Sequence, residues 1–260
     1  MRVMLGVPTA GAPAVPFTES LKHLTLPSGV EALERTIVTG NYIPAERDLL
    51  LERAIEWQAD VAVMCDDDMV LPADALVLLL EALAGDPAAA IAGALYYSRD
   101  GLRPMAVDGW DPESVSTGWI PAFGESEPVA VDGIGFGCVA IRVSAIREFA
   151  RPFFPAHVLI EPADGRVRIC NEDYLFCRRV RQTGYRVLLH PGVRCGHYDR
   201  ATGRTAPAAP EPASATNVRR VLVRIGDSYR LVALEGAPDA AARERYVRAD
   251  LTYIVSESTA

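Results

Sequence analysis

The chain has 260 residues, half of them hydrophobic, and a formal net charge of −8 at pH 7. This length allows one sizeable core, or one domain with a small appendage. A protein that binds nucleic-acid backbones in general presents a basic face, so the acidic balance argues against that class.

The cysteine pattern and the apolar runs indicate a reducing compartment and no membrane span. The 5 cysteines form an odd set without a CxxC pair, which argues against a disulfide framework and favours a cytoplasmic location. The first apolar run is too short for a signal peptide. The most apolar window, Leu76 to Leu95, is interrupted by Glu81, Asp86 and Pro87, so it is not expected to span a bilayer.

The first 95 residues alternate between strand and helix patterns. Two helices are expected, one beginning at Pro44 and one running from Pro72 to Gly85. Apolar runs predict strands over residues 2–7, 35–38, 61–65 and 89–95. Strands that alternate with helices predict an α/β fold with a doubly wound, mostly parallel sheet.

The rest of the chain begins with a region of little periodicity, residues 96–135, which is typical of a loop-rich binding region. Further elements are expected as a strand over 137–142, a short helix over 143–150, a helix from 171 to 184 and a strand over 185–189. Residues 201–217 have the composition of a Pro/Ala-rich linker. Residues 218–260 are predicted to form a small C-terminal appendage. It is expected to contain a hairpin around Gly226-Asp227 and then a helix near 241–250.

Three consecutive carboxylates, Asp66, Asp67 and Asp68, directly follow the apolar strand over 61–65. In an open α/β sheet, ligands bind at the carboxyl ends of the strands. An extended backbone would point Asp66 and Asp68 in the same direction. Because adjacent carboxylates repel one another without a cation or water, the cluster suits Mg²⁺ or Mn²⁺ that bridges to phosphates. The alternative is a solvated acidic turn.

Asp173 is the candidate general base. In a helix it shares a face with Phe176, Cys177 and Val180. A carboxylate at the end of an inward-facing stripe is expected to have a raised pKa, as a general base requires. The alternative is that Glu172 and Asp173 only complement the helix dipole.

Three further features could contribute to a site. His197 follows the strand over 185–189, where an imidazole can be a ligand for Mn²⁺, although a lone loop histidine is more often a surface residue; His190 is a rival ligand. The run 133–137 holds three glycines, which either let a ligand approach the backbone or form a bulge. Trp110 and Trp119 could stack on a sugar or base, or simply pack.

These features, in this order, resemble the glycosyltransferases of the GT-A fold, especially the family-2-like members, over about residues 2–199. Such enzymes carry a DxD motif, a glycine-containing acceptor loop, an xED motif and a C-terminal metal-binding histidine. The matching positions are 66–68, 133–135, 171–173 and His197. Arg47-Asp48 also resembles the Arg-Asn pair that opens the donor-side helix, with Asp in place of Asn.

The resemblance implies a GT-A (Rossmann-like) domain over 1–200, flanked by helices, with a nucleotide-sugar-binding half (1–100) and an acceptor or catalytic half (101–200). It implies Mn²⁺ or Mg²⁺ held by Asp68 and His197, with Asp66 on the metal or the ribose. The implied donor contacts are Pro8, Thr9, Arg47, Asp66 and Asp67; the implied base is Asp173; and the acceptor contacts are Glu172 and Gly135, with Trp110 as the candidate stacking residue.

The predicted reaction moves a sugar from a UDP- or GDP-sugar to a hydroxyl of an unidentified acceptor, with inversion at the anomeric carbon. A retaining transferase with the same metal site and a non-catalytic nucleotide- or carbohydrate-binding module are the alternatives. A nucleotidyltransferase is disfavoured because the loop 8–13 has no lysine or arginine. A homo-oligomer is left open.

Overall fold

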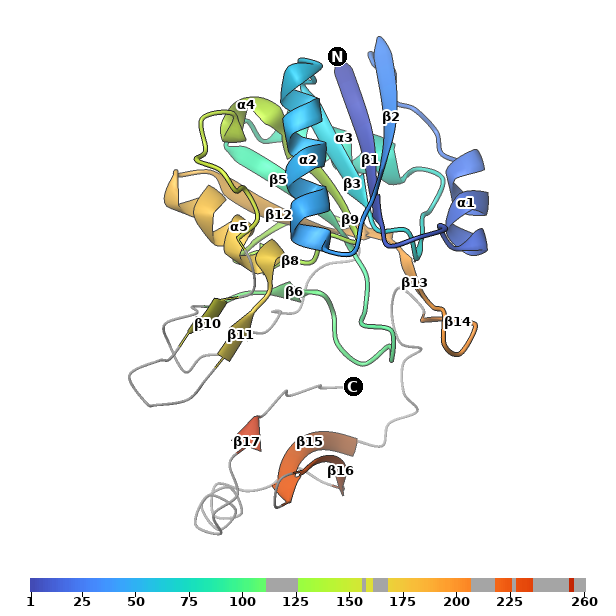
Figure 1. The fold of residues 1–260 in the computed structure, drawn as a ribbon, viewed down its shortest axis with the longest axis vertical. Coiled ribbons are helices and arrows are strands. Elements are labelled where there is room, and N and C mark those ends of the chain that lie inside the picture. Colours follow the sequence, from blue (N-terminus) through green and yellow to red (C-terminus); the bar gives the residue numbers. More distant parts are fainter. Residues whose placement is uncertain are drawn as a thin grey trace. The chain divides into compact units, whose positions relative to one another are not determined.

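The computed structural model describes residues 1–110, 126–155, 158–160, 168–206, 218–225, 228–235 and 253–254. The chain divides into two compact units, Met1–Ala209 and Pro210–Ala260. Figure 1 shows the elements of each unit along the chain.

A seven-stranded sheet forms the centre of the first unit, in the order β2-β1-β3-β9-β5-β12-β7. Its strands are β1 (Arg2–Thr9), β2 (Ala32–Thr39), β3 (Val61–Cys65), β5 (Ala89–Leu95), β7 (Val129–Val131), β9 (Cys138–Arg142) and β12 (Arg186–Arg194). Strands β2, β1, β3, β5 and β12 run in one direction, whereas β9 and β7 run in the other. The predicted α/β class with a mainly parallel sheet is confirmed.

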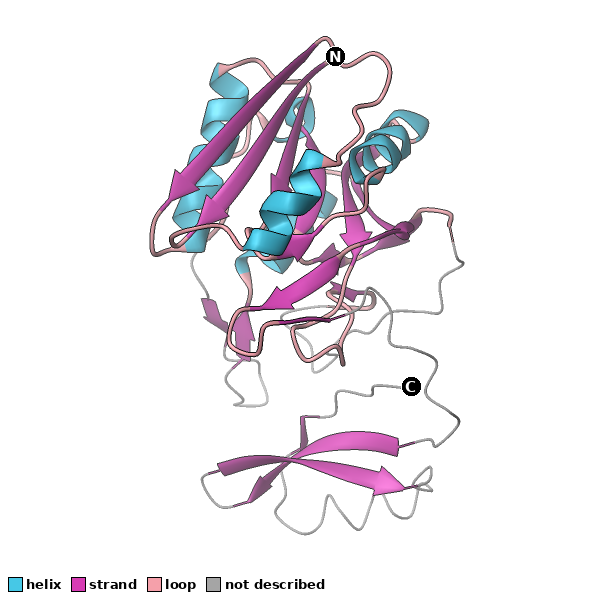
Figure 2. Cartoon of the chain, turned by 90° about the vertical axis from the view of Figure 1, so that its right-hand side faces the viewer, coloured by secondary structure: helices cyan, strands magenta, loops and turns pink. Residues whose placement is uncertain are grey.

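Helices cover both faces of this sheet (Figures 1 and 2). They are α1 (Val15–Lys22), α2 (Ile43–Glu56), α3 (Ala75–Gly85), α4 (Val143–Ile146) and α5 (Glu172–Gln182). Successive residues of a strand point to opposite faces, so Met4 packs in the core with Leu50 of α2, while Val3 packs in the core with Leu76 of α3. The α2 core also includes residues of α4 and α5, and the α3 core includes Phe17 of α1.

A small second sheet brings distant segments together at the end of β3. It has the order β14-β13-β4, from β4 (Met69–Val70), β13 (Gly196–Asp199) and β14 (Arg204–Ala206). Strand β13 pairs antiparallel with β4, which places His197 opposite Met69. The Tyr198 N–H also donates to the Asp68 carbonyl at 2.8 Å. His197 is therefore held beside the turn that carries the three aspartates.

The first unit also contains two short strand pairs: β6 (Ala106–Val107) with β8 (Gly133–Ile134), and β10 (Val158–Ile160) with β11 (Arg168–Cys170). In the second unit, β15 (Val218–Ile225) pairs antiparallel with β16 (Ser228–Glu235) and with β17 (Tyr253–Ile254). The helix expected near 241–250 lies outside the described residues. Within the described residues, no helix combines the length and apolar character needed to cross a membrane.

Candidate active site

The three aspartates lie in a turn between β3 and β4. The Met69 N–H donates to the Asp66 carbonyl at 3.2 Å, which closes the turn. The extended backbone expected for Asp66–Asp68 is therefore wrong. The turn leads directly into β4, which pairs with β13.

Each aspartate of the turn forms an ion pair with an arginine from a different part of the chain. The pairs are Asp66 with Arg47 of α2 (2.9 Å), Asp67 with Arg200 after β13 (2.9 Å), and Asp68 with Arg99 after β5 (2.5 Å). The repulsion expected among three adjacent carboxylates is thus offset by cations that the protein itself supplies.

Asp68 and His197 face each other at the edge of the sheet. The His197 Nε2 atom lies 3.5 Å from Asp68 Oδ2, and His197 Nδ1 lies 2.8 Å from the Tyr97 carbonyl oxygen. Because a carbonyl only accepts hydrogen bonds, Nδ1 carries a proton and Nε2 is the atom turned toward the carboxylate. The hydrogen bond to the Tyr97 carbonyl fixes the orientation of the ring, as is common for metal-binding histidines.

The pKa values of this pair move apart. Burial acts to raise the pKa of Asp68, but hydrogen bonds from His197 and Arg99 outweigh it, so the pKa lies below its ordinary value. Burial acts to lower the pKa of His197, but its hydrogen bonds to Asp68 and to the Tyr97 carbonyl raise the net value. These opposite pKa shifts favour an ionised Asp68 carboxylate with positive charge beside it.

The donor set fits a divalent metal only as part of a larger coordination shell. Carboxylate oxygen and imidazole nitrogen suit Mn²⁺, and Mg²⁺ is commonly held by one or two protein groups plus phosphate oxygens and water. Within the described part of the chain, no group of three or more His, Cys, Asp or Glu side chains is arranged to hold a metal ion. Asp68 and His197 would thus need phosphate oxygens or water as the remaining ligands.

Arg47 is buried between two carboxylates. Its side chain is 4% exposed, with Nη2 2.9 Å from Asp66 Oδ1 and Nη1 2.6 Å from Glu172 Oε1. The guanidinium carbon lies 5.5 Å from the centre of the Phe136 ring, within cation–π range. This enclosure supports a positioning role for Arg47, and the predicted contact with a nucleotide stays a prediction.

Asp173 lies in the first turn of α5 on the buried face predicted from the sequence. Phe176, Cys177 and Val180 on that face are fully buried, and Asp173 is 7% exposed. Burial raises the pKa of Asp173 to about 7; the Arg47 charge opposes this rise and the Glu172 charge adds to it. The expected direction of the pKa shift is confirmed, and the carboxyl group changes protonation state near neutral pH.

The glycine loop accommodates Tyr96. A Cβ atom at position 135 would overlap the Tyr96 hydroxyl, and one at Gly137 would lie 2.7 Å from Tyr96 Cζ. The Tyr96 hydroxyl accepts a hydrogen bond from the Gly137 N–H at 3.0 Å. The Tyr96 ring meets the His197 ring edge-on, with 5.6 Å between centres. Gly135 therefore acts on the site through Tyr96, a residue to which the sequence assigned no role.

Trp110 lies next to the candidate base. Its ring centre is 5.7 Å from that of Tyr174, the residue after Asp173, and its backbone N–H donates to Asp132 Oδ2 at 2.9 Å. This position is compatible with the stacking role predicted for Trp110. Trp119 lies outside the described residues.

The end of β1 meets the same turn. The Thr9 side chain is buried, and its hydroxyl contacts the Asp67 carboxylate and accepts a hydrogen bond from the Gly11 N–H at 3.1 Å. Arg200 donates to the Ala12 carbonyl at 3.0 Å, so it holds the loop after β1 as well as Asp67. Pro8 is buried directly before Thr9. Thr9 and Asp67 are thus partners of each other, and their predicted donor contacts stay predictions.

Two arginines of the site, Arg99 and Arg200, were not anticipated. Both follow strands in segments with no helical or strand periodicity, and a lone arginine in a loop carries no signal for a partner far away in the sequence. The rival ligand His190 is buried within β12, and burial lowers its pKa.

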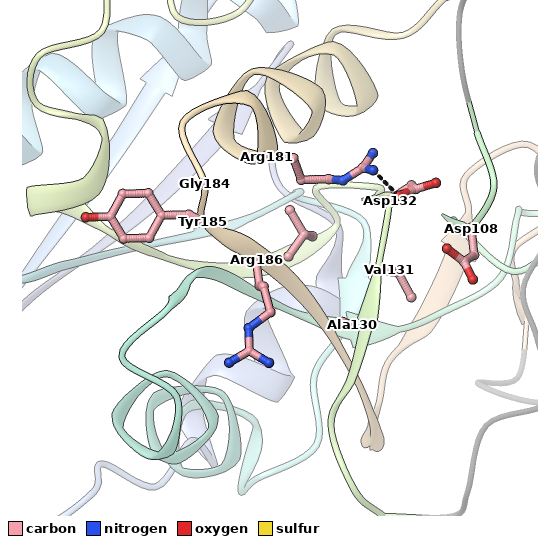
Figure 3. A pocket seen from close by; sticks show the side chains of 9 residues that line it. Asp108, Ala130, Val131, Asp132, Arg181, Gly184, Tyr185 and Arg186 are labelled. Carbon is pink, nitrogen blue, oxygen red and sulfur yellow. Dashed lines mark ion pairs between the residues drawn. The ribbon is translucent and has the colours of Figure 1, made fainter. Parts of the chain in front are cut away.

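A separate cavity of about 300 Å³ lies beside β7 and the end of α5 (Figure 3). Arg181 and Asp132 form an ion pair in its wall. Its lining residues are Asp108, Ala130, Val131, Asp132, Arg181, Gly184, Tyr185, Arg186 and Val187. These residues include none of the predicted site residues, so the cavity is distinct from the carboxylate cluster.

Solved structures match the chain at low sequence identity. A197 from STIV matches with a TM-score of 0.55 and 18% identity, over 82% of this chain and 97% of that protein. GalNAc-T7, in a crystal structure with UDP, GalNAc and Mn²⁺, matches with a TM-score of 0.52 and 14% identity, over 77% of this chain and 44% of that chain. No protein-family model and no curated protein matches the sequence. Likeness at this identity concerns the fold, and the chain has a GT-A-like, Rossmann-like fold.

Proposed function

We propose that the chain is a metal-dependent glycosyltransferase that moves a sugar from a nucleoside-diphosphate sugar to an acceptor hydroxyl. One observation carries this proposal: the turn after β3 brings Asp68 against His197, while Arg47 joins Asp66 of the same turn to Glu172, next to the buried Asp173. GalNAc-T7, whose fold is similar, was crystallised with UDP, GalNAc and Mn²⁺, and this motivates a nucleotide sugar and a divalent metal as the ligands to test.

In this proposal, Asp68 and His197 would hold Mn²⁺ or Mg²⁺ near the donor diphosphate, and Asp66 would lie toward the ribose or the metal. The bound metal would offset the negative charge that develops on the departing nucleoside diphosphate. Pro8 and Thr9 lie where β1 reaches the same edge and would border the nucleotide. Arg47 and Asp67 hold the surrounding segments in place through the contacts described above.

Asp173 acts as the general base. A new bond forms between the acceptor oxygen and the anomeric carbon, while the bond from that carbon to the phosphate oxygen breaks. The acceptor hydroxyl gives its proton to the Asp173 carboxylate, and the nucleoside diphosphate leaves with the electron pair of the broken bond. A pKa of about 7 lets Asp173 take up a proton efficiently near neutral pH. Attack from the side opposite the leaving group inverts the anomeric configuration.

A thermal-shift panel of nucleotide sugars with and without Mn²⁺ tests the proposal. Binding to the folded state raises the melting temperature, so a cognate UDP- or GDP-sugar should stabilise the protein more strongly with Mn²⁺ than without it. An Asp68→Ala variant should lose this Mn²⁺-dependent part. A panel in which no nucleotide sugar produces a metal-dependent shift would contradict the proposal.

Two assays separate the alternatives. Hydrolysis or transfer of the cognate donor by the purified protein distinguishes a transferase from a non-catalytic binding module. NMR of the sugar product distinguishes inversion from retention, because a product with the donor's anomeric configuration would identify a retaining enzyme and remove the role of Asp173 as base.

A further inference from the structure

We propose that Arg99 competes with the divalent metal for Asp68, so that it neutralises this carboxylate in the free protein and moves to the donor diphosphate when metal and donor bind. This inference rests on the function proposed above. It assigns a role to a residue outside the DxD, glycine-loop, xED and histidine motifs.

The contact occupies the atom that a metal would need. Arg99 Nη2 and Nε lie 2.5 and 3.1 Å from Asp68 Oδ2, and the same oxygen lies 3.5 Å from His197 Nε2. A metal held jointly by Asp68 and His197 would have to lie close to this oxygen. The guanidinium and the metal are both cations at that position, so their mutual repulsion favours the presence of one at a time.

The exposure of the two partners is very unequal. The Arg99 side chain is 59% exposed, whereas that of Asp68 is 5% exposed. Asp68 cannot turn to solvent without unpacking the turn, but the guanidinium can leave by rotation of a flexible side chain. The ion pair therefore breaks by movement of the Arg99 side chain, while Asp68 stays in place.

The backbone beneath Arg99 is fixed by its own hairpin. The Ser98 N–H donates to the Arg103 carbonyl at 2.7 Å, and the Met105 N–H donates to the Tyr96 carbonyl at 2.9 Å. The Tyr97 carbonyl in the same hairpin contacts His197 Nδ1 at 2.8 Å. The hairpin thus keeps Arg99 within side-chain reach of the metal position after the guanidinium has left Asp68.

A diphosphate at this position would give the released guanidinium a new partner. Arginine forms short, charge-assisted hydrogen bonds with phosphate oxygens, often in pairs. Loss of Arg99 should therefore have opposite effects on two ligands: Mn²⁺ alone should bind more tightly, and UDP or GDP in the presence of Mn²⁺ should bind more weakly. A purely structural role for Arg99 would not produce opposite signs.

The test is a set of binding titrations on the full chain. Mn²⁺ affinity is measured by electron paramagnetic resonance of free Mn²⁺, and the affinity for UDP, then GDP, is measured by calorimetry in saturating Mn²⁺. We expect Arg99→Ala to bind Mn²⁺ alone roughly fivefold more tightly than wild type, because a partly exposed ion pair no longer competes. The same variant should bind the nucleoside diphosphate at least about fivefold more weakly.

Arg103→Ala is the matched control, since it removes one exposed arginine from the same hairpin and keeps the backbone hydrogen bonds of Arg103. It should behave like wild type in both titrations. In an Asp68→Asn background, adding Arg99→Ala should not raise Mn²⁺ affinity, and a rise there would show that Arg99 competes at a group other than Asp68.

The outcomes separate this inference from the proposed function. If Mn²⁺ and a nucleoside diphosphate bind the wild type together but Arg99→Ala leaves Mn²⁺ affinity unchanged, the competition is wrong and the metal site stands. If Mn²⁺ binds neither protein, with or without UDP or GDP, both the metal-dependent function and the role of Arg99 are wrong.

Discussion

Arg47 Nη1 lies 2.6 Å from Glu172 Oε1, although 125 positions separate the two residues in the chain. The other end of the same guanidinium contacts Asp66, so one buried cation joins the end of β3 to the start of α5. The resemblance assigns these two segments to the donor half and the acceptor half, and Arg47 links them.

Replacing Arg47 by methionine should strongly destabilise the protein. The change removes the Arg47 contacts to the Glu172 and Asp66 carboxylates, and breaking a buried pair from one side costs about 3–5 kcal/mol. Urea unfolding monitored by circular dichroism measures the loss. Glu172→Gln combined with Arg47→Met should recover part of it, because one of the two carboxylate charges that Arg47 faced is removed.

Arg53→Met in the same helix is the control for this change. Arg53 is exposed in the last turn of α2, so its replacement should change stability by no more than about 0.5 kcal/mol. Equal losses for the two variants would mean that helix propensity, not the buried ion pairs, sets the effect.

Asp173→Asn should stabilise the protein increasingly as the pH rises. The folded-state pKa of about 7 exceeds the unfolded value of about 3.9, so the folded state binds more protons between these values and wild-type stability falls with rising pH. Asparagine cannot ionise, so the stability advantage of the variant should grow by about 3 kcal/mol between about pH 5 and about pH 8. Denaturant titrations at the two pH values measure this, and a constant difference would show that the pKa of Asp173 is ordinary.

The same group should set the acid limb of the activity profile. Only ionised Asp173 accepts a proton, so wild-type kcat/KM should fall about tenfold per pH unit below about pH 7. Asp173→Asn should abolish transfer while UDP or GDP still binds in the presence of Mn²⁺. Transfer near the wild-type rate would exclude Asp173 as the base.

Asp67 and Asp68 should respond differently to alanine substitution. Asp68→Ala removes a candidate metal ligand, so Mn²⁺-dependent nucleotide binding should be lost. Asp67→Ala removes the partner of Thr9 and Arg200, so it should lower the melting temperature and weaken binding less. Thermal shift with UDP or GDP, with and without Mn²⁺, distinguishes the two variants. Equal losses of nucleotide binding would mean that the different roles assigned to Asp67 and Asp68 are wrong.

Gly135→Ala should disturb the site through Tyr96. The added methyl group would overlap the Tyr96 hydroxyl and displace a ring that packs against His197, so both the melting temperature and Mn²⁺ affinity should fall. Tyr96→Phe removes the overlapping oxygen, so the double variant should recover part of the loss. If the double variant has the same melting temperature and Mn²⁺ affinity as Gly135→Ala, the added methyl group does not act through the Tyr96 hydroxyl.

The strands of the fold could be predicted because burial leaves a local pattern. The runs Val61–Cys65 and Ala89–Leu95 are apolar throughout, and the structure has strands at those positions. The expected end of the last strand at 189 was too early: β12 continues to Arg194 through a register shift against β5. A pattern of apolar residues does not reveal such an irregularity.

The partners of the three aspartates could not be predicted from the sequence. Arg99 lies 31 positions from Asp68 and Arg200 lies 133 positions from Asp67, and neither belongs to a periodic segment. The burial of Asp173 could be predicted because it shares a helical face with Phe176 and Val180, and helical periodicity is a local property.

The pairing of β4 with β13 has a consequence for synthesis of the chain. Asp68 is made long before His197, and the two meet only when β13 adds to the small sheet. Until then the ribosome-bound chain presents the acidic turn without its imidazole, and Asp67 without Arg200. The contact between Asp68 and His197, on which the proposed metal site depends, can thus form only late in translation.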